Sequence, residues 1–165
     1  MATETTLVDF ADPDAVAAWS AVDDRVMGGV SRSALRAAGD HARFAGTVSD
    51  EHRGGFASVR AELDRAPPAG AEHLWIEARG APATYYLNLR TDGGFDGVSY
   101  RVDFRPTPDW SRLELPFADL RATFRGRDVP EAPAFEPERA RQIGLMIADG
   151  QLGDFALDLR AIGTR

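Results

Sequence analysis

Hydrophobic and polar residues alternate one by one over most of the chain, which is the period of a β-strand with one buried face. The alternation is cleanest over 98–104, where every second residue is a valine or an aromatic. It recurs in short segments that glycine, proline and Asp-Gly turn signals separate. We predict strands over 6–10, 31–37, 43–48, 56–63, 74–79, 84–90, 98–104, 110–115, 142–148 and 153–162.

One segment near the N-terminus departs from this period and predicts a short helix over about 13–19. Asp12 is a residue type that caps helix N-termini, and Pro13 is favoured at the first helical position. Asp14 adds an acidic side chain to the first turn, where the helix dipole favours it. The sequence therefore predicts one short N-terminal helix ahead of the strands.

The regular spacing of turn signals predicts the fold class. Nine or ten short strands with frequent turns are typical of an antiparallel sandwich or barrel. The stretch 123–137 contains three prolines and is expected to be a long irregular loop, with single helical turns near 117–120 and 137–141. A chain of 165 residues fits one domain, and no repeat or linker divides 1–165. We therefore predict a single all-β domain.

Composition narrows the classes of function. The formal net charge of −7 repels nucleic acid and anionic membrane surfaces, so we expect neither as a partner. The chain has no cysteine, which excludes disulfides and thiolate metal sites. The N-terminus lacks a signal-peptide pattern, and no apolar run approaches the ~18 residues that span a membrane. We expect a cytoplasmic protein without membrane insertion.

Signatures of catalysis are missing from the sequence. There is no cysteine nucleophile, no Gly-x-Ser-x-Gly elbow, no Walker loop and no dinucleotide fingerprint. The three histidines are scattered near predicted turns without the spacing of zinc ligands. We therefore expect a protein that is not an enzyme and has no zinc site.

The most unusual stretch is 22–33, which places two adjacent acids ahead of a double glycine. Asp23 and Asp24 can bind backbone amides or arginines, while the glycines permit a positive φ or a close approach of the backbone. One interpretation is a strained turn locked by the two acids. The other is a ligand or partner loop at one rim of the fold. The candidate binding residues in this stretch are Asp23, Asp24, Met27, Gly28 and Gly29.

Two predicted strands carry arginines on their polar sides. Arg60 shares a strand face with Ser58, and Arg90 shares one with Asn88. If these faces point the same way, the side chains form a polar patch on the concave side of a sandwich, where Asp23 and Asp24 could join them. The patch is either a structural ion-pair cluster or a site for a sugar, nucleotide or carboxylate.

Other candidates for recognition lie elsewhere in the chain. Arg125 sits in the proline-rich stretch, either bound to a carboxylate while Phe124 fills the core, or on a partner-binding surface. Trp75 and Tyr86 fall on the polar sides of their strands and are the aromatics that could be exposed. Exposed aromatic rings on a sandwich can act as stacking platforms for sugars.

A series of motifs, in order along nearly the whole chain, resembles the complex I intermediate-associated protein family. Together they are far more specific than any one of them alone. The matching segments are Asp-Arg-Val-Met-Gly-Gly-Val-Ser (24–31), Phe-Ala-Gly (44–46), Gly-Gly-Phe-Ala-Ser-Val-Arg (54–60), Asn-Leu-Arg-Thr-Asp (88–92), Phe-Asp-Gly-Val-Ser-Tyr (95–100), Pro-Phe (116–117), Phe-Arg-Gly (124–126) and Ile-Gly-Leu-Met-Ile-Ala-Asp (143–149).

The resemblance implies a galactose-binding-like jelly-roll β-sandwich, in agreement with the strand pattern. It implies a non-catalytic assembly role toward subunits or intermediates of NADH:ubiquinone oxidoreductase, with a small-ligand, carbohydrate-like binding module as the alternative. Mitochondrial members carry a transit peptide, and 1–6 do not show such a pattern, so we expect a stand-alone bacterial-type member. Domains of this fold often hold a structural calcium ion, for which Asp50, Asp92 and Asp96 lie in predicted loops; no other cofactor is expected.

Overall fold

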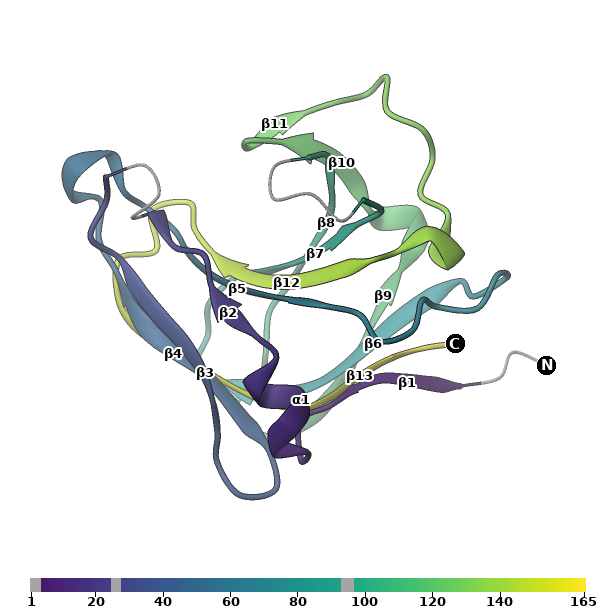
Figure 1. Ribbon diagram of the computed structural model, residues 1–165. Helices are drawn as coiled ribbons and strands as arrows, with labels where there is room; N and C mark the ends of the chain where they lie inside the picture. Colours follow the sequence, from purple (N-terminus) through teal and green to yellow (C-terminus); the bar gives the residue numbers. More distant parts are fainter. Residues whose placement is uncertain (1–3, 25–27, 93–96) are drawn as a thin grey trace.

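Two antiparallel sheets face each other and enclose the hydrophobic core, as the computed structural model of residues 4–24, 28–92 and 97–165 shows (Figure 1). The first sheet has the order β3-β4-β13-β6-β9, with β1 paired to β13. Its strands are β1 (Thr5–Asp9), β3 (Arg32–Ala37), β4 (Ala42–Val48), β6 (His73–Gly80), β9 (Ser111–Pro116) and β13 (Gly153–Thr164).

The second sheet has the order β11-β10-β8-β7-β12-β5-β2. Its strands are β2 (Ser20–Ala21), β5 (Ala57–Glu62), β7 (Tyr85–Arg90), β8 (Ser99–Phe104), β10 (Arg121–Phe124), β11 (Arg127–Asp128) and β12 (Gln142–Ile147). The helical elements of the described chain are α1 (Pro13–Ala17) and the 3-10 turns Glu51–Arg53, Phe117–Asp119 and Pro137–Arg139. Each of these is short, so the architecture is an all-β sandwich with a short N-terminal helix, as expected.

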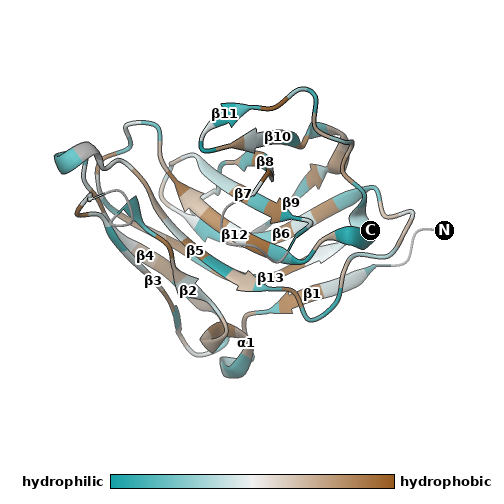
Figure 2. Cartoon of the chain, turned by 45° about the horizontal axis from the view of Figure 1, so that its top comes forward, coloured by the Kyte–Doolittle hydropathy of each residue, from teal (hydrophilic) through white to brown (hydrophobic). Residues whose placement is uncertain are grey.

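The alternation of the sequence decides which face of each strand is buried. In β12 the apolar residues Ile143, Leu145 and Ile147 point into the core, while the residues between them point outward. In Figure 2, hydrophobic and hydrophilic positions alternate along the strands in the same way. The same parity holds on the neighbouring strands β5, β7 and β8, so their polar residues share the outer face of the second sheet.

Register brings particular polar residues into one row across that outer face. Arg60 of β5 lies opposite Gly144 of β12, and Gly144 lies opposite Asn88 of β7. Asn88 in turn lies opposite Arg101 of β8. Residues from distant parts of the sequence therefore become neighbours, because β12 inserts between β5 and β7.

The stretch 123–137 differs from the expected irregular loop, because a tight hairpin occupies its start. Strands β10 and β11 pair through Phe124 and Arg127. The two residues between them, Arg125 and Gly126, have φ of 51° and 80°. Positive φ at both central positions is the geometry of a type I′ turn. The usual Asn-Gly or Asp-Gly signal is missing, which is why the sequence pattern does not indicate a hairpin.

Among the helices of the described residues, none is long and apolar enough to cross a membrane.

Candidate functional site

Asp24 is buried and accepts four hydrogen bonds from two other segments of the chain. The amide and hydroxyl of Ser31 donate to it at 2.9 and 2.5 Å, and the amides of Gly55 and Phe56 donate at 2.6 and 3.3 Å. Burial alone would raise the pKa of Asp24, but these hydrogen bonds outweigh it and hold the pKa below its usual value. Asp24 is therefore a charged anchor that holds both segments to its own.

Asp23 makes a similar, smaller set of contacts. The amide and hydroxyl of Ser33 donate to its carboxylate at 3.0 and 2.6 Å, and the amide of Ser58 donates at 2.9 Å. The possible network of both acids with Arg60 and Arg90 is not formed, because serine hydroxyls and backbone amides of the described chain bind both carboxylates. The sequence could not indicate these partners, since they meet only when β3 and β5 approach each other.

The double glycine serves the fold in the two ways that its sequence suggested. Gly28 has a φ of 88°, which other residues rarely adopt. Gly29 lies so close to the Asp24 carboxylate that a Cβ atom would collide with it. Met27, another candidate binding residue, lies outside the described residues.

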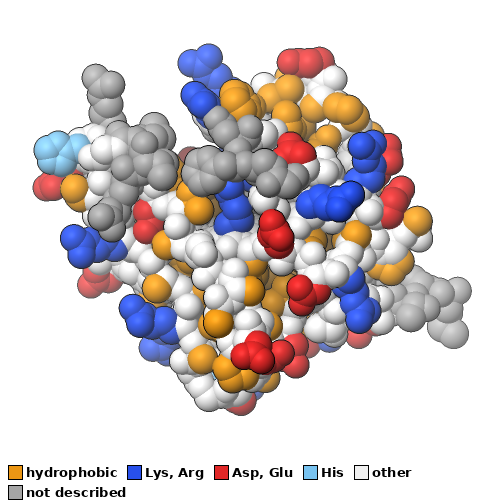
Figure 3. Space-filling model, in the orientation of Figure 1, with side chains coloured by type: hydrophobic (Ala, Val, Ile, Leu, Met, Phe, Trp, Pro, Cys, Tyr) orange, Lys and Arg blue, Asp and Glu red, His pale blue; other side chains and the backbone are white. Residues whose placement is uncertain are grey.

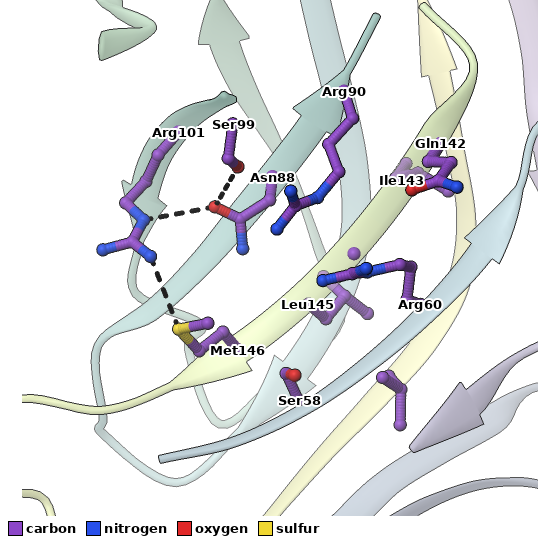
Figure 4. A pocket seen from close by; sticks show the side chains of 12 residues that line it. Ser58, Arg60, Asn88, Arg90, Ser99, Arg101, Gln142, Ile143, Leu145 and Met146 are labelled. Carbon is purple, nitrogen blue, oxygen red and sulfur yellow. Dashed lines mark hydrogen bonds between the residues drawn. The ribbon is translucent and has the colours of Figure 1, made fainter. Parts of the chain in front are cut away.

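The outer face of the second sheet contains a shallow hollow of about 340 Å³, open solvent included (Figure 4). We call it the outer hollow. The residues that line it come from β5, β7, β8 and β12 and are Ser58, Val59, Arg60, Asn88, Arg90, Ser99, Arg101, Gln142, Ile143, Gly144, Leu145 and Met146.

The structure brings three of the sequence candidates together in the outer hollow, namely Arg60, Asn88 and Arg90. In Figure 4, the side chain of Arg60 reaches over β12 from β5, and the guanidinium of Arg90 lies between Asn88 and Arg60. Arg90 also donates to the carbonyl of Gly97 at 2.8 Å. These residues share one face because each occupies an outward position on its strand, which is the parity that the sequence indicated.

Arg101 belongs to this site, although the sequence candidates did not include it. Its Nε donates to Oδ1 of Asn88 at 3.1 Å, and its Nη2 lies 3.6 Å from the sulfur of Met146. The hydroxyl of Ser99 donates to the same Oδ1 at 3.1 Å. The sequence did indicate that Arg101 points outward from the strand 98–104. It could not indicate that β8 lies beside β7, and this strand order is what places Arg101 in the site.

The guanidinium of Arg101 is largely removed from water, and few negative charges nearby compensate its positive charge. Burial lowers the pKa of Arg101, and the neighbouring charges of Arg121 and Arg90 add to that lowering, while Tyr86 and Asp149 oppose it. Within the described part of the chain, no carboxylate lies within salt-bridge distance of Arg101. A partly buried cation of this kind favours an anionic partner.

Tyr86 lies on the outer face beside the outer hollow, and both its ring and its hydroxyl group make contacts within the protein. The guanidinium of Arg101 lies 4.4 Å from the centre of its ring, within the range of a cation–π contact. Its hydroxyl donates to Asp149. This hydrogen bond is the first cause of the raised pKa of Tyr86, and burial adds to it. The ring is therefore partly covered. Trp75, the other aromatic that could have been exposed, is only 3% exposed.

Gly144 forms the floor of the outer hollow between Arg60 and Asn88. A Cβ atom at this position would lie 3.2 Å from the Val59 carbonyl and 3.9 Å from Cβ of Asn88. A side chain there would occupy the space above β12 between the arginines. The glycine therefore keeps the hollow open.

Arg125 is not part of the outer hollow. It lies at the tip of the β10–β11 hairpin, with its guanidinium 5.3 Å from the ring centre of Phe124. Phe124 is 38% exposed, so of the two interpretations the one in which it fills the core is wrong. The short hairpin carries its tip away from the core, and this removes Phe124 from the packed interior.

A structural calcium ion stays a prediction. The described residues contain no group of three or more histidine, aspartate or glutamate side chains that could hold a metal ion. Of the three loop aspartates in the prediction, Asp96 lies outside those residues, while Asp50 and Asp92 lie within them.

Comparison with solved structures identifies proteins with the same fold. The family 11 carbohydrate-binding module of the cellulase Lic26A-Cel5E of Clostridium thermocellum superposes with a TM-score of 0.76 at 14% identity, covering 99% of this chain and 95% of the module. A structure of the Clostridium thermocellum family 11 module in complex with a β-1,3-1,4-mixed-linked tetrasaccharide gives a TM-score of 0.73 at 16% identity, with coverage of 98% and 94%. These likenesses establish the galactose-binding-like jelly-roll fold.

Two sequence relatives come from eukaryotes. An uncharacterized protein of Schizosaccharomyces pombe is 31% identical over 166 residues, which cover 86% of this chain and 75% of the relative. The mitochondrial Complex I intermediate-associated protein 30 of Drosophila melanogaster is 27% identical over 185 residues, which cover 97% of this chain but 62% of that protein. The fly protein is thus considerably longer than the region it shares with this chain.

The family model for Complex I intermediate-associated protein 30 (CIA30) matches residues 8–159. This match runs from the first strand to the middle of the last one and includes every residue of the outer hollow. The chain therefore belongs to the Complex I intermediate-associated protein 30 family.

Proposed function

We propose that this protein is a non-catalytic binding protein that assists assembly of respiratory complex I, or a related membrane complex, by holding a protein partner at the outer hollow. The observation that carries the proposal is the guanidinium-lined hollow on the central strands of the second sheet. Family membership supplies the biological context. The cytoplasm is the compartment we propose for this activity.

The chemistry of the hollow supports binding over catalysis. Its described polar groups are mainly guanidinium and amide groups, which donate hydrogen bonds but are poor general bases near neutral pH. The two acids that were candidates for the site, Asp23 and Asp24, are fully engaged in holding loops and strands together. A donor-rich surface on a rigid sheet is suited to recognition of acceptor groups.

The surface also indicates how a partner would be held. The exposed large hydrophobic residues among those described are Val30, Phe124 and Leu152, which come from three different segments. In Figure 3, hydrophobic atoms form small separate groups among arginine and acidic side chains. Because no broad apolar patch is visible on this face, we infer that polar and charged contacts hold the partner.

Gene deletion in the native host tests this function. We expect the deletion strain to lose assembled complex I on native gels and to lose NADH:ubiquinone reductase activity in isolated membranes. The wild-type gene should restore both, whereas Arg60→Gln combined with Arg90→Gln should restore neither while the protein accumulates normally. Unchanged complex I in the deletion strain would refute the proposed function.

Carbohydrate binding is the second candidate, because Tyr86 and amide groups lie on the outer face of a fold that solved carbohydrate-binding modules share. The contact of Arg101 with the Tyr86 ring argues against it, since that contact occupies part of the stacking surface. Affinity electrophoresis in gels containing mixed-linked β-glucan distinguishes the two candidates. Retardation that Tyr86→Ala abolishes would favour the carbohydrate candidate; unaltered migration would favour the protein partner.

A further inference from the structure

The outer hollow contains a hydrogen-bond donor that no described residue uses. Asn88 is only 8% exposed, and its Oδ1 accepts from both Ser99 and Arg101. These two bonds fix the orientation of the amide group, and Nδ2 then points into the hollow between Arg101 and Arg90 (Figure 4). Within the described chain Nδ2 has no acceptor. Most of the Asn88 side chain is buried, while Nδ2 stays open to the hollow, so this oriented donor is available to water or to a ligand.

Arg101 supplies a second, independent observation at the same point. Its guanidinium is desolvated, faces the positive charges of Arg90 and Arg121, and has no salt bridge to the described residues. Its guanidinium contacts the Asn88 oxygen, the Tyr86 ring and the Met146 sulfur, none of which carries a full negative charge. The site therefore combines an under-compensated positive charge with a directed neutral donor.

We propose that Arg101 and Asn88 form a subsite for a carboxylate group of an acidic peptide segment, and that Arg60 and Arg90 receive further acidic groups of the same segment. This inference rests on the proposed function, because it takes the partner to be a protein. A carboxylate is planar and has two acceptor oxygens, which suits a guanidinium edge and an amide donor placed side by side.

The dimensions of the sheet suit an extended segment. Arg60 and Arg101 are separated by three strand intervals, because β12 and β7 lie between β5 and β8. At about 4.8 Å per interval, the separation is about 14 Å, which an extended chain covers in about four residues. Two acidic side chains at that spacing could reach both ends of the hollow. The net charge of −7 disfavours binding of an acidic segment elsewhere on the surface, so binding is expected at the hollow alone.

Calorimetric titration of the purified protein with hexaglutamate tests the inference, with hexaglutamine as the uncharged control. We expect hexaglutamate alone to bind, with an affinity that falls as salt increases. Arg101→Gln should weaken binding on the order of thirtyfold, as expected when one member of a desolvated charge pair is removed. Arg36→Gln removes the same charge from β3 on the other sheet and should leave binding unchanged.

Asn88→Asp provides a variant that separates binding from folding. It keeps the oxygen that Ser99 and Arg101 use and replaces Nδ2 by a second oxygen. The new carboxylate would pair with Arg101 and occupy the position of the ligand. We therefore expect a melting temperature equal to or above that of the wild type together with loss of hexaglutamate binding. Retained binding in this variant would overturn the inference even if Arg101→Gln fails to fold.

Further ligands distinguish the chemistry of the site. Trigalacturonate that binds in place of hexaglutamate would overturn the peptide assignment in favour of an acidic sugar. Inorganic phosphate that competes at equal concentration would overturn the preference for carboxylate. If hexaglutamate fails to bind while the gene still restores complex I, this inference is wrong and the proposed function stands. Hexaglutamate binding without any effect of gene deletion on complex I would support the subsite and refute the proposed function.

Discussion

At the scale of single residues, the adjacent acids have separate but related structural roles. Asp24 connects Ser31 with the backbone of Gly55 and Phe56, while Asp23 connects Ser33 with Ser58. An unpaired buried carboxylate would be unfavourable, but each of these accepts several hydrogen bonds in its charged form. We therefore expect Asp23 and Asp24 to contribute to the free energy of unfolding.

Asp24→Asn should destabilise the fold by about 2–3 kcal/mol, because an NH₂ group would replace an oxygen that now accepts from amides and a hydroxyl. Urea unfolding followed by tryptophan fluorescence measures the change. Asp50→Asn is the matched control, since Asp50 is exposed and its side chain makes no capping bond. That control should stay within about 0.5 kcal/mol of the wild type.

The lowered pKa of Asp24 has a consequence for acid stability. A carboxyl whose pKa is lower in the folded state stabilises the fold above its unfolded pKa of about 3.9, and this contribution is lost as the pH falls through the folded pKa. The free energy of unfolding should therefore decrease from about pH 4 downward, and less steeply in Asp24→Asn. Parallel curves for the two proteins between neutral and acidic pH would contradict this account.

At the scale of elements, the first sheet carries its own charged row on the face away from the core. Asp158 of β13 lies opposite Arg43 of β4 and Arg79 of β6. Arg43 donates to it at 2.8 and 3.3 Å, and Arg79 donates at 3.0 Å. Burial would raise the pKa of Asp158, but the two arginines hold it below its usual value. The row thus joins three strands that are distant in sequence.

A double-mutant cycle of Asp158→Asn with Arg43→Gln should give a small but measurable coupling energy in unfolding experiments. The value is modest because the Arg43 side chain is 52% exposed and water screens the pair. A cycle of Arg43→Gln with Asp128→Asn, whose carboxylate is on the other sheet, should show no coupling. Equal coupling in both cycles would contradict a specific contact.

At the scale of the whole molecule, a small cationic hollow coexists with a net charge of −7. A double-stranded DNA backbone is too broad to enter the hollow, and the surrounding surface repels it. We therefore expect no retardation of a DNA fragment in gel-shift experiments at low salt, even at micromolar protein. Retardation that increases as the salt concentration is lowered would show that the basic residues act as an extended surface.

The sequence was sufficient for the fold but only partly for the site. Strand parity placed Arg60, Asn88 and Arg90 on outward positions, because side chains alternate along any strand. It could not give the order of the strands, so the contribution of Arg101 and the position of Gly144 between the two sides of the hollow needed the structure. The serine partners of the acids were equally hidden, since no local pattern records which loops meet.

The contacts of the acid pair have a further consequence for solubility. Asp23 and Asp24 hold together the region where β3, an edge strand of the first sheet, lies near β2, an edge strand of the second. Edge strands carry unpaired backbone groups that can recruit another chain. We call this contact region the seam; through it, the two acids hold the two sheets together along one side of the sandwich. Opening this seam with Asp23→Asn and Asp24→Asn together should produce dimers or larger aggregates in size-exclusion chromatography under conditions where most of the sandwich remains folded.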